Sequence, residues 1–144
     1  MKLKSQIIGL LCASFCISAV AAEGKWTEGY GQGDLEYFID QKGVRLFIGC
    51  PTDEGSADAS STVSLFQTRN DKEIQPFTIV AGGHTFHGPF HTGSRVDDNN
   101  FVALLENLRK TDAVVKAGNL TITFPKSNAA KVIPTGKKIP CNFL

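Results

Sequence analysis

The sequence lacks an excess of charge of either sign. Its 144 residues include 15 lysines and arginines and 14 aspartates and glutamates, and no basic run exceeds a pair such as Lys137 and Lys138. A protein that binds nucleic acid or an anionic membrane surface normally carries a basic patch, because phosphate groups attract and hold positive charge. We therefore expect no nucleic-acid partner.

The sequence also lacks an apolar run that could span a bilayer. The run of residues 7–20 has 14 residues, whereas a transmembrane helix needs about 20. Lys2 and Lys4 precede it and the small residues 19–22 follow it, which is the pattern of a secretory signal peptide. We expect residues 1–22 to be removed, leaving one β-rich domain of residues 23–144, periplasmic or secreted, with no integral membrane span.

Cysteine is scarce once this segment is removed. Cys12 and Cys16 lie in the expected signal peptide, so Cys50 and Cys141 are the two that remain. An oxidising compartment favours disulfides, and two cysteines allow one intramolecular pairing. We predict this Cys50–Cys141 disulfide, which would stabilise the domain by about 4–5 kcal/mol on the chain-entropy view. An intermolecular bridge or two free thiols are the alternatives.

Familiar catalytic motifs are absent. The sequence contains neither Gly-x-Ser-x-Gly nor His-Glu-x-x-His, and its Gly-rich residues 23–33 are not followed by the Gly-Lys-Ser/Thr of a phosphate loop. The carboxylates of Asp97 and Asp98 are explained by the start of a helix, where they favour the helix dipole. We therefore predict that the protein is not an enzyme, with no catalytic residue and no cofactor.

One segment has the period of an amphipathic helix. Phe101, Leu104, Leu105 and Leu108 recur at intervals of three and four residues and form one apolar stripe. Polar residues occupy the other faces. We expect this helix to begin just after Asp98 and to pack its stripe against strands.

Much of the remaining chain alternates between apolar and polar residues, as a half-buried strand does. Strands are expected near residues 34–40, 44–50, 63–67, 77–81, 84–87, 113–115 and 120–124, and a short helical turn near residues 128–132. The Gly-rich residues 23–33 are expected to form a lead-in segment. The pattern predicts a mainly β fold, a β-sandwich or partly open barrel of six to eight short strands, with one amphipathic helix packed on it.

All three histidines lie within residues 82–95. The spacing of His84, His87 and His91 would suit a helix, but the glycines and Pro89 among them prevent one. On a strand His84 and His87 face opposite sides, whereas a metal ion needs donors that converge at about 2 Å. The segment is therefore expected to be a polar hairpin edge, and metal binding by the three histidines is the alternative.

Phe86 and Phe90 alternate with these histidines. Aromatic residues on an exposed loop often anchor a protein partner. Phenylalanine is also among the more buried residue types, so we favour a location in the core for both rings. If the segment does bind a partner, we predict that His87, Phe90 and His91 make the contacts, with the acidic residues 53–58 as the next candidate surface.

The second half of the chain resembles a known family. A helix that begins with Phe101 is followed by Val114-Val115, by the strand of residues 120–124 and by the short turn of residues 127–130. This order is similar to that of the invasion-associated locus B proteins, which are β-sandwich domains of the periplasm or cell surface. The resemblance implies that fold and compartment, and it brings no catalytic residue. That family usually carries more cysteines, so its role in host invasion is not carried over.

These observations leave two classes of function. The one we favour is a non-enzymatic exported binding protein, for example an inhibitor or immunity-type protein, that acts on a protein partner in the envelope through residues 82–95. The alternative is a periplasmic protein that binds a small ligand or a metal ion through His84, His87 and His91.

Overall fold

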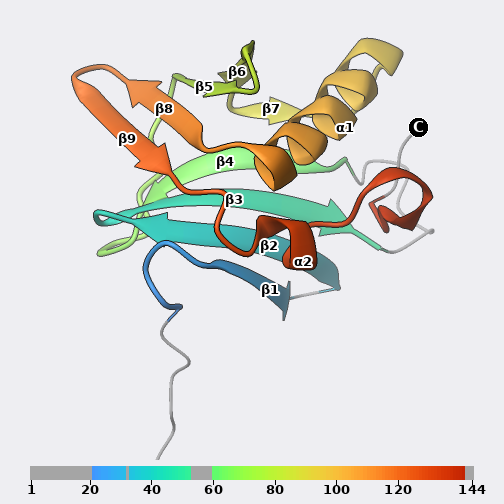
Figure 1. The fold of residues 1–144 in the computed structure, drawn as a ribbon, viewed down its shortest axis with the longest axis horizontal. Coiled ribbons are helices and arrows are strands. Elements are labelled where there is room, and N and C mark those ends of the chain that lie inside the picture. The colour runs from blue at the N-terminus through green and yellow to red at the C-terminus, as the bar shows by residue number, and fades with distance from the viewer. Residues whose placement is uncertain (1–20, 32, 53–59, 142–144) are drawn as a thin grey trace, which may run out of the picture.

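The computed structural model describes residues 21–31, 33–52 and 60–141. The expected signal peptide up to residue 20 and the acidic residues 53–58 lie outside this part. Within it, the chain forms nine strands in two antiparallel sheets and one long helix, so the predicted mainly β sandwich is confirmed (Figure 1).

The two sheets divide the chain unevenly. The five-stranded sheet has the order β1 (Trp26–Gly31), β2 (Asp34–Gln41), β3 (Val44–Pro51), β4 (Thr62–Gln67), β7 (Phe90–His91). The four-stranded sheet has the order β6 (His84–Gly88), β5 (Phe77–Ala81), β8 (Ala113–Ala117), β9 (Leu120–Phe124). The four-stranded sheet and α1 (Arg95–Lys110) lie on the same side of the five-stranded sheet (Figure 1).

Rows of paired side chains build the core from both sheets. Trp26, Ile39, Leu46 and Leu65 follow one another across β1 to β4, and all four are buried. In the other sheet the corresponding buried row is Phe86, Ile79, Val115 and Ile122. Because paired residues of antiparallel strands share a face, the period-two pattern of each strand places its apolar residues on the inner side.

Helix α1 buries the predicted stripe of Phe101, Leu104, Leu105 and Leu108. It begins at Arg95, four residues before the predicted start. The N-cap is Ser94, whose hydroxyl accepts from the backbone N–H of Asp97 and donates to its carboxylate. The two predicted capping aspartates therefore lie within the first turn, where negative charge still favours the helix dipole.

Two strands were not predicted from the sequence. The Gly-rich lead-in contains β1, in which Trp26 is buried and Tyr30 is 70% exposed. Glycine has a low strand propensity, but pairing with β2 along six residues outweighs that preference here. The two-residue strand β7 lies outside the expected strands, because it is too short to show a period.

The end of the described chain is fastened to the body in three ways. Cys141 forms the predicted disulfide with Cys50 of β3. Helix α2 (Ala129–Val132) begins after Asn128, whose side chain bonds to the backbone N–H and C=O of Trp26. Arg109 of α1 donates to the backbone carbonyl of Ile133. A short 3-10 helix, η1 (Gly136–Lys138), lies between α2 and Cys141.

Among the described residues, no helix has the length and apolar character needed to cross a membrane.

Candidate binding surface at two edge strands

Residues 82–95, which we name the β6–β7 segment, pass from one sheet to the other. Strand β6 is an edge of the four-stranded sheet, and β7 is an edge of the five-stranded sheet. An edge strand presents unpaired backbone N–H and C=O groups, which another chain can pair with. A single stretch of the chain therefore supplies an edge to both sheets.

Two local features hold this segment in place. Gly88, at the end of β6, pairs with Phe77 of β5, and a Cβ at this glycine would overlap the Phe77 ring. After β7, Thr92 and Ser61 exchange two hydrogen bonds, of 2.8 and 2.9 Å, and both residues are buried. The segment is thus fixed at the crossing between the sheets and at its end, before helix α1 begins.

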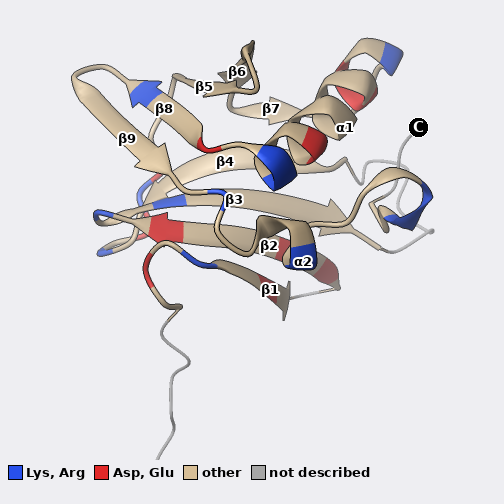
Figure 2. Cartoon of the chain, viewed as in Figure 1, with Lys and Arg blue, Asp and Glu red and all other residues tan. Residues whose placement is uncertain are grey.

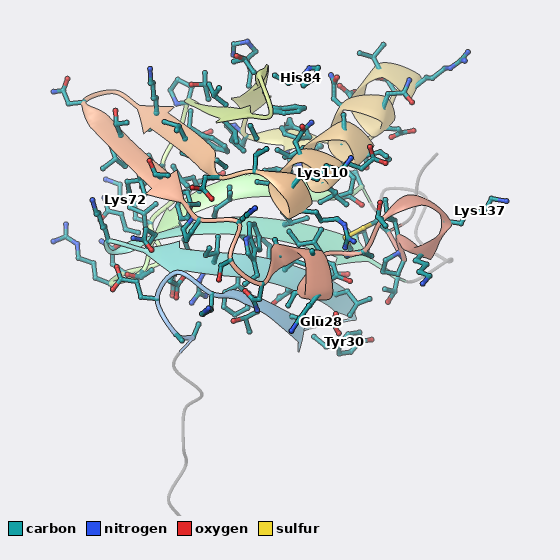
Figure 3. All side chains as sticks on the ribbon, in the orientation of Figure 1. Glu28, Tyr30, Lys72, His84, Lys110 and Lys137 are labelled. Atoms are coloured by element: carbon teal, nitrogen blue, oxygen red, sulfur yellow. A yellow bond between two sulfur atoms is a disulfide. The ribbon has the colours of Figure 1, made fainter. Side chains whose placement is uncertain are left out.

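The strand register separates the three histidines. His84 lies on the same side of β6 as Phe86, with their ring centroids 6.4 Å apart, but it is the first residue of the strand and its side chain is exposed at the edge of the molecule (Figure 3). His87 lies on the opposite side of β6, as an extended strand requires. His91 belongs to β7, where it pairs with Thr62 of β4. Within the described ranges, no three His, Cys, Asp or Glu side chains are placed to hold a metal ion.

A pocket of about 250 Å³ lies beside this segment. The residues that line it come from β6, β7 and the first turns of α1: Thr85, Phe86, His87, Phe90, Asp97 and Asn100. Its walls combine aromatic rings with a carboxylate, an amide and an imidazole. Such a surface can receive one side chain of a partner and offer it both apolar contact and hydrogen bonds.

Two of the three predicted contact residues line this pocket. His87 and Phe90 were predicted contacts and line it together, whereas His91 and His84 do not. Phe86 is 7% exposed and belongs to the core, as favoured from its residue type, and Phe90 is half-buried with one side against the core. Asp97 and Asn100 were missed as pocket residues, because only the packing of α1 against the β6–β7 segment brings them there.

Comparison with known proteins places the chain in a family. A model of the YfjT family matches residues 24–133. The chain belongs to the YfjT family. Two uncharacterized proteins of Escherichia coli strain K12 are similar to it. YkfB is 31% identical over 145 residues, which cover 90% of this chain and 89% of YkfB. YfjT is 31% identical over 137 residues, which cover 85% of each chain.

No solved structure matches the chain. The matched YfjT region contains all the strands and both α-helices of the described chain, and it ends before Cys141. The β6–β7 segment and its pocket therefore lie inside the part shared with the family. The resemblance to the invasion-associated locus B proteins is not among these matches and stays an expectation from the sequence.

Proposed function

We propose that this YfjT-family protein is an exported, non-enzymatic binding protein that captures a protein partner along the β6–β7 segment. The inhibitor or immunity-type role in the envelope belongs to the same proposal. One observation carries it: the segment supplies one edge strand to each sheet and borders a pocket.

The first step of the argument is the chemistry of β6. Natural edge strands are usually protected from pairing by charged residues, especially lysine. The five residues of β6 are His84, Thr85, Phe86, His87 and Gly88, with no Lys, Arg, Asp or Glu among them. Thr85 and His87 are exposed. An unprotected edge of this kind suits the addition of a strand from a partner protein, in which backbone hydrogen bonds supply affinity.

The second step is the pocket at the end of that edge. A strand added to β6 would run beside Thr85 and His87, which both line the pocket. A side chain of the added strand could then enter between Phe90 and Asn100. Specificity in strand addition comes from such side-chain pockets, because the backbone pairing itself is independent of sequence.

The third step concerns the compartment. The Cys50–Cys141 disulfide supports an oxidising location, since such bonds are rare in reducing cytoplasm. The basic start and apolar run of residues 2–20 support export. A bridge between residues 91 positions apart also limits the freedom of the scaffold, so less entropy is lost when the segment binds.

The test places charge on β6. In the variant Thr85→Lys with His87→Lys, two exposed residues gain the lysines that natural edges use against pairing. The matched control is Thr121→Lys with Thr123→Lys on β9, the opposite edge of the same sheet, where both threonines are exposed. We expect chemical crosslinking in an envelope extract, followed by mass spectrometry, to join one protein to the wild type and the β9 variant and to lose it in the β6 variant.

Two results would contradict the proposal. Equal crosslinking of that protein to both variants would remove β6 from the interface. A rise in the melting temperature on addition of Zn²⁺ or Cu²⁺, lost in His87→Ala, would favour the metal-binding alternative, because a bound ligand stabilises the folded state.

A further inference from the structure

The outer face of the five-stranded sheet carries three phenylalanines, which we name the outer aromatic row: Phe38, Phe47 and Phe66. Phe38 pairs with Phe47 across β2 and β3, and Phe66 pairs with Arg45 across β3 and β4. All three rings are half-buried, unlike the buried residues that alternate with them on the inner face. Packing of the core does not account for three aromatic residues on this side.

Glycines make room for this row. A Cβ at Gly49 would lie 2.9 Å from the Oγ1 of Thr62 and 3.2 Å from the Phe47 ring. A Cβ at Gly31 would lie 2.9 Å from a carboxylate oxygen of Glu36. The absence of side chains at these two positions allows the Phe47 ring and the Glu36 carboxylate to lie over the sheet.

The row already holds one guanidinium. Arg45 donates to both carboxylate oxygens of Asp40, at 2.7 and 2.9 Å, and its guanidinium carbon lies 4.3 Å from the centre of the Phe38 ring. A cation over an aromatic face with a carboxylate beside it is a favourable arrangement, because the ring presents negative charge density to the cation. The first ring of the row is therefore occupied within the chain.

The other two rings border an open pocket of about 300 Å³. Phe47 and Phe66 meet edge to face, with centroids 6.0 Å apart, and Glu36 and Asp71 complete the lining with Arg45. Arg45–Asp40 is the one ion pair found among the described side chains, so Glu36 and Asp71 share the pocket with Arg45 without forming an ion pair with a described cation. The pKa of Arg45 is raised above its usual value, chiefly by its hydrogen bond to Asp40 and further by the charges of Asp40, Asp71 and Glu36.

The five-stranded sheet, like this pocket, carries more acidic than basic residues. Strands β1 to β4 contain the acidic residues Glu28, Asp34, Glu36 and Asp40 and the single basic residue Arg45. Figure 2 shows acidic residues along β1 and β2. The four strands of the other sheet carry Lys116 and no acidic residue. This contrast in charge directs a cationic group to the outer aromatic row and away from the other sheet.

We propose that this pocket, which Arg45 also lines, binds an arginine side chain of a second protein through Phe47, Phe66 and the carboxylates of Glu36 and Asp71, in the way that Phe38 and Asp40 hold Arg45. The planar guanidinium stacks on an aromatic ring and forms paired hydrogen bonds with a carboxylate, which an ammonium group cannot do in the same geometry. The residues that line this site are all different from those that line the pocket beside the β6–β7 segment, so the inference does not depend on the proposed function.

The test uses two synthetic peptides. One is Ac-Gly-Arg-Gly-Arg-Gly-amide, and the other has citrulline in place of both arginines, which keeps the shape of the side chain and removes its charge. Each peptide is titrated into the protein and followed by NMR. The measurement is made at physiological ionic strength, because salt screens long-range attraction between exposed charges. We expect the arginine peptide to shift the ring signals of Phe47 and Phe66 in a saturable way, and the citrulline peptide to leave them in place.

Variants of the protein distinguish binding in the pocket from a general attraction of the peptide to acidic residues. Glu36→Gln with Asp71→Asn should weaken binding of the arginine peptide by about tenfold, and Phe66→Leu by about fivefold, as expected for an exposed cation with an aromatic and carboxylate site. The matched control is Glu28→Gln with Asp34→Asn on β1 and β2, which also removes two acidic charges, both outside the pocket, and should leave the affinity unchanged. An equal loss in the control, or equal binding of the citrulline peptide, would overturn the assignment.

Discussion

The two faces of the five-stranded sheet differ although the same strands build them. On the inner face, Ile39, Leu46 and Leu65 are fully buried beneath the second sheet and α1. On the outer face, Phe38 and Phe47 pair with each other across β2 and β3 and are half-buried. The inner apolar residues are explained by folding alone, so the outer ones are the better evidence of an interaction. This difference predicts that stability and binding can be changed separately.

The largest effect on stability is expected from removing the disulfide, in which Cys50 lies on the inner face of β3. Replacing Cys50 and Cys141 together by Ala should lower the free energy of unfolding by about 4 kcal/mol, because the bridge spans 91 positions and restricts the unfolded chain. Urea unfolding of the variant, and of the wild type with and without a reducing agent, measures the loss. A midpoint that neither treatment moves would show that the bridge does not stabilise the inner face.

Two neighbouring residues of β3 provide the most direct comparison of the faces. Leu46→Ala removes a side chain with no exposed surface and should cost about 2–5 kcal/mol. Phe47→Ala removes a larger side chain, but this side chain is only half-buried and contacts Phe66 edge to face. The expected loss in free energy of unfolding is therefore about 1 kcal/mol. The difference between their urea midpoints is the measurement. A greater cost for Phe47 would make the outer face part of the core.

A smaller loss of stability is expected at alkaline pH from Tyr37, which lies on the inner face. The pKa of Tyr37 is raised above 10.0, first by burial and then by the charge of Glu28, with which it pairs across β1 and β2. The unfolded chain releases this proton at a lower pH than the folded one. The contribution of Tyr37 to stability is therefore complete below pH 10 and falls as the pH rises through the raised pKa.

Thermal unfolding from about pH 9 to about pH 11 tests this, with Tyr37→Phe as the reference. The two proteins differ only in the Tyr37 phenol, so the melting temperature of the wild type should fall more over this range than that of the variant. Parallel curves would mean that the phenol is equally acidic in the folded and unfolded chains.

Period-two alternation was enough to predict β2 and β3, and on such a strand Phe38 lies on the other face from Tyr37 and Ile39. It could not show that Phe38, Phe47 and Phe66 form one row, since that depends on the order and register of three strands. Strand β1 was missed because its glycines resemble a loop, whereas the structure uses Gly31 to admit the Glu36 carboxylate.

For the helix and the pocket too, the sequence predicted some features and not others. The apolar stripe predicted the buried face of α1, and the start was misplaced because Ser94 and Asp97, which share two hydrogen bonds, were not recognised as a capping pair. His87 and Phe90 were predicted contacts because both lie in the short segment of residues 82–95. Asn100 joins them only through tertiary packing, for which a single sequence gives no signal.

The smallest expected effect on stability is at Arg45. Arg45→Lys keeps the charge but loses the paired hydrogen bonds to Asp40 and the stacking on Phe38. The Arg45 side chain is 32% exposed, and solvent weakens such ion pairs, so the free energy of unfolding should fall by less than about 1 kcal/mol. Urea midpoints measured beside those of Phe47→Ala would test this. A loss as large as that of Leu46→Ala would show that the outer face contributes to folding as strongly as the inner one.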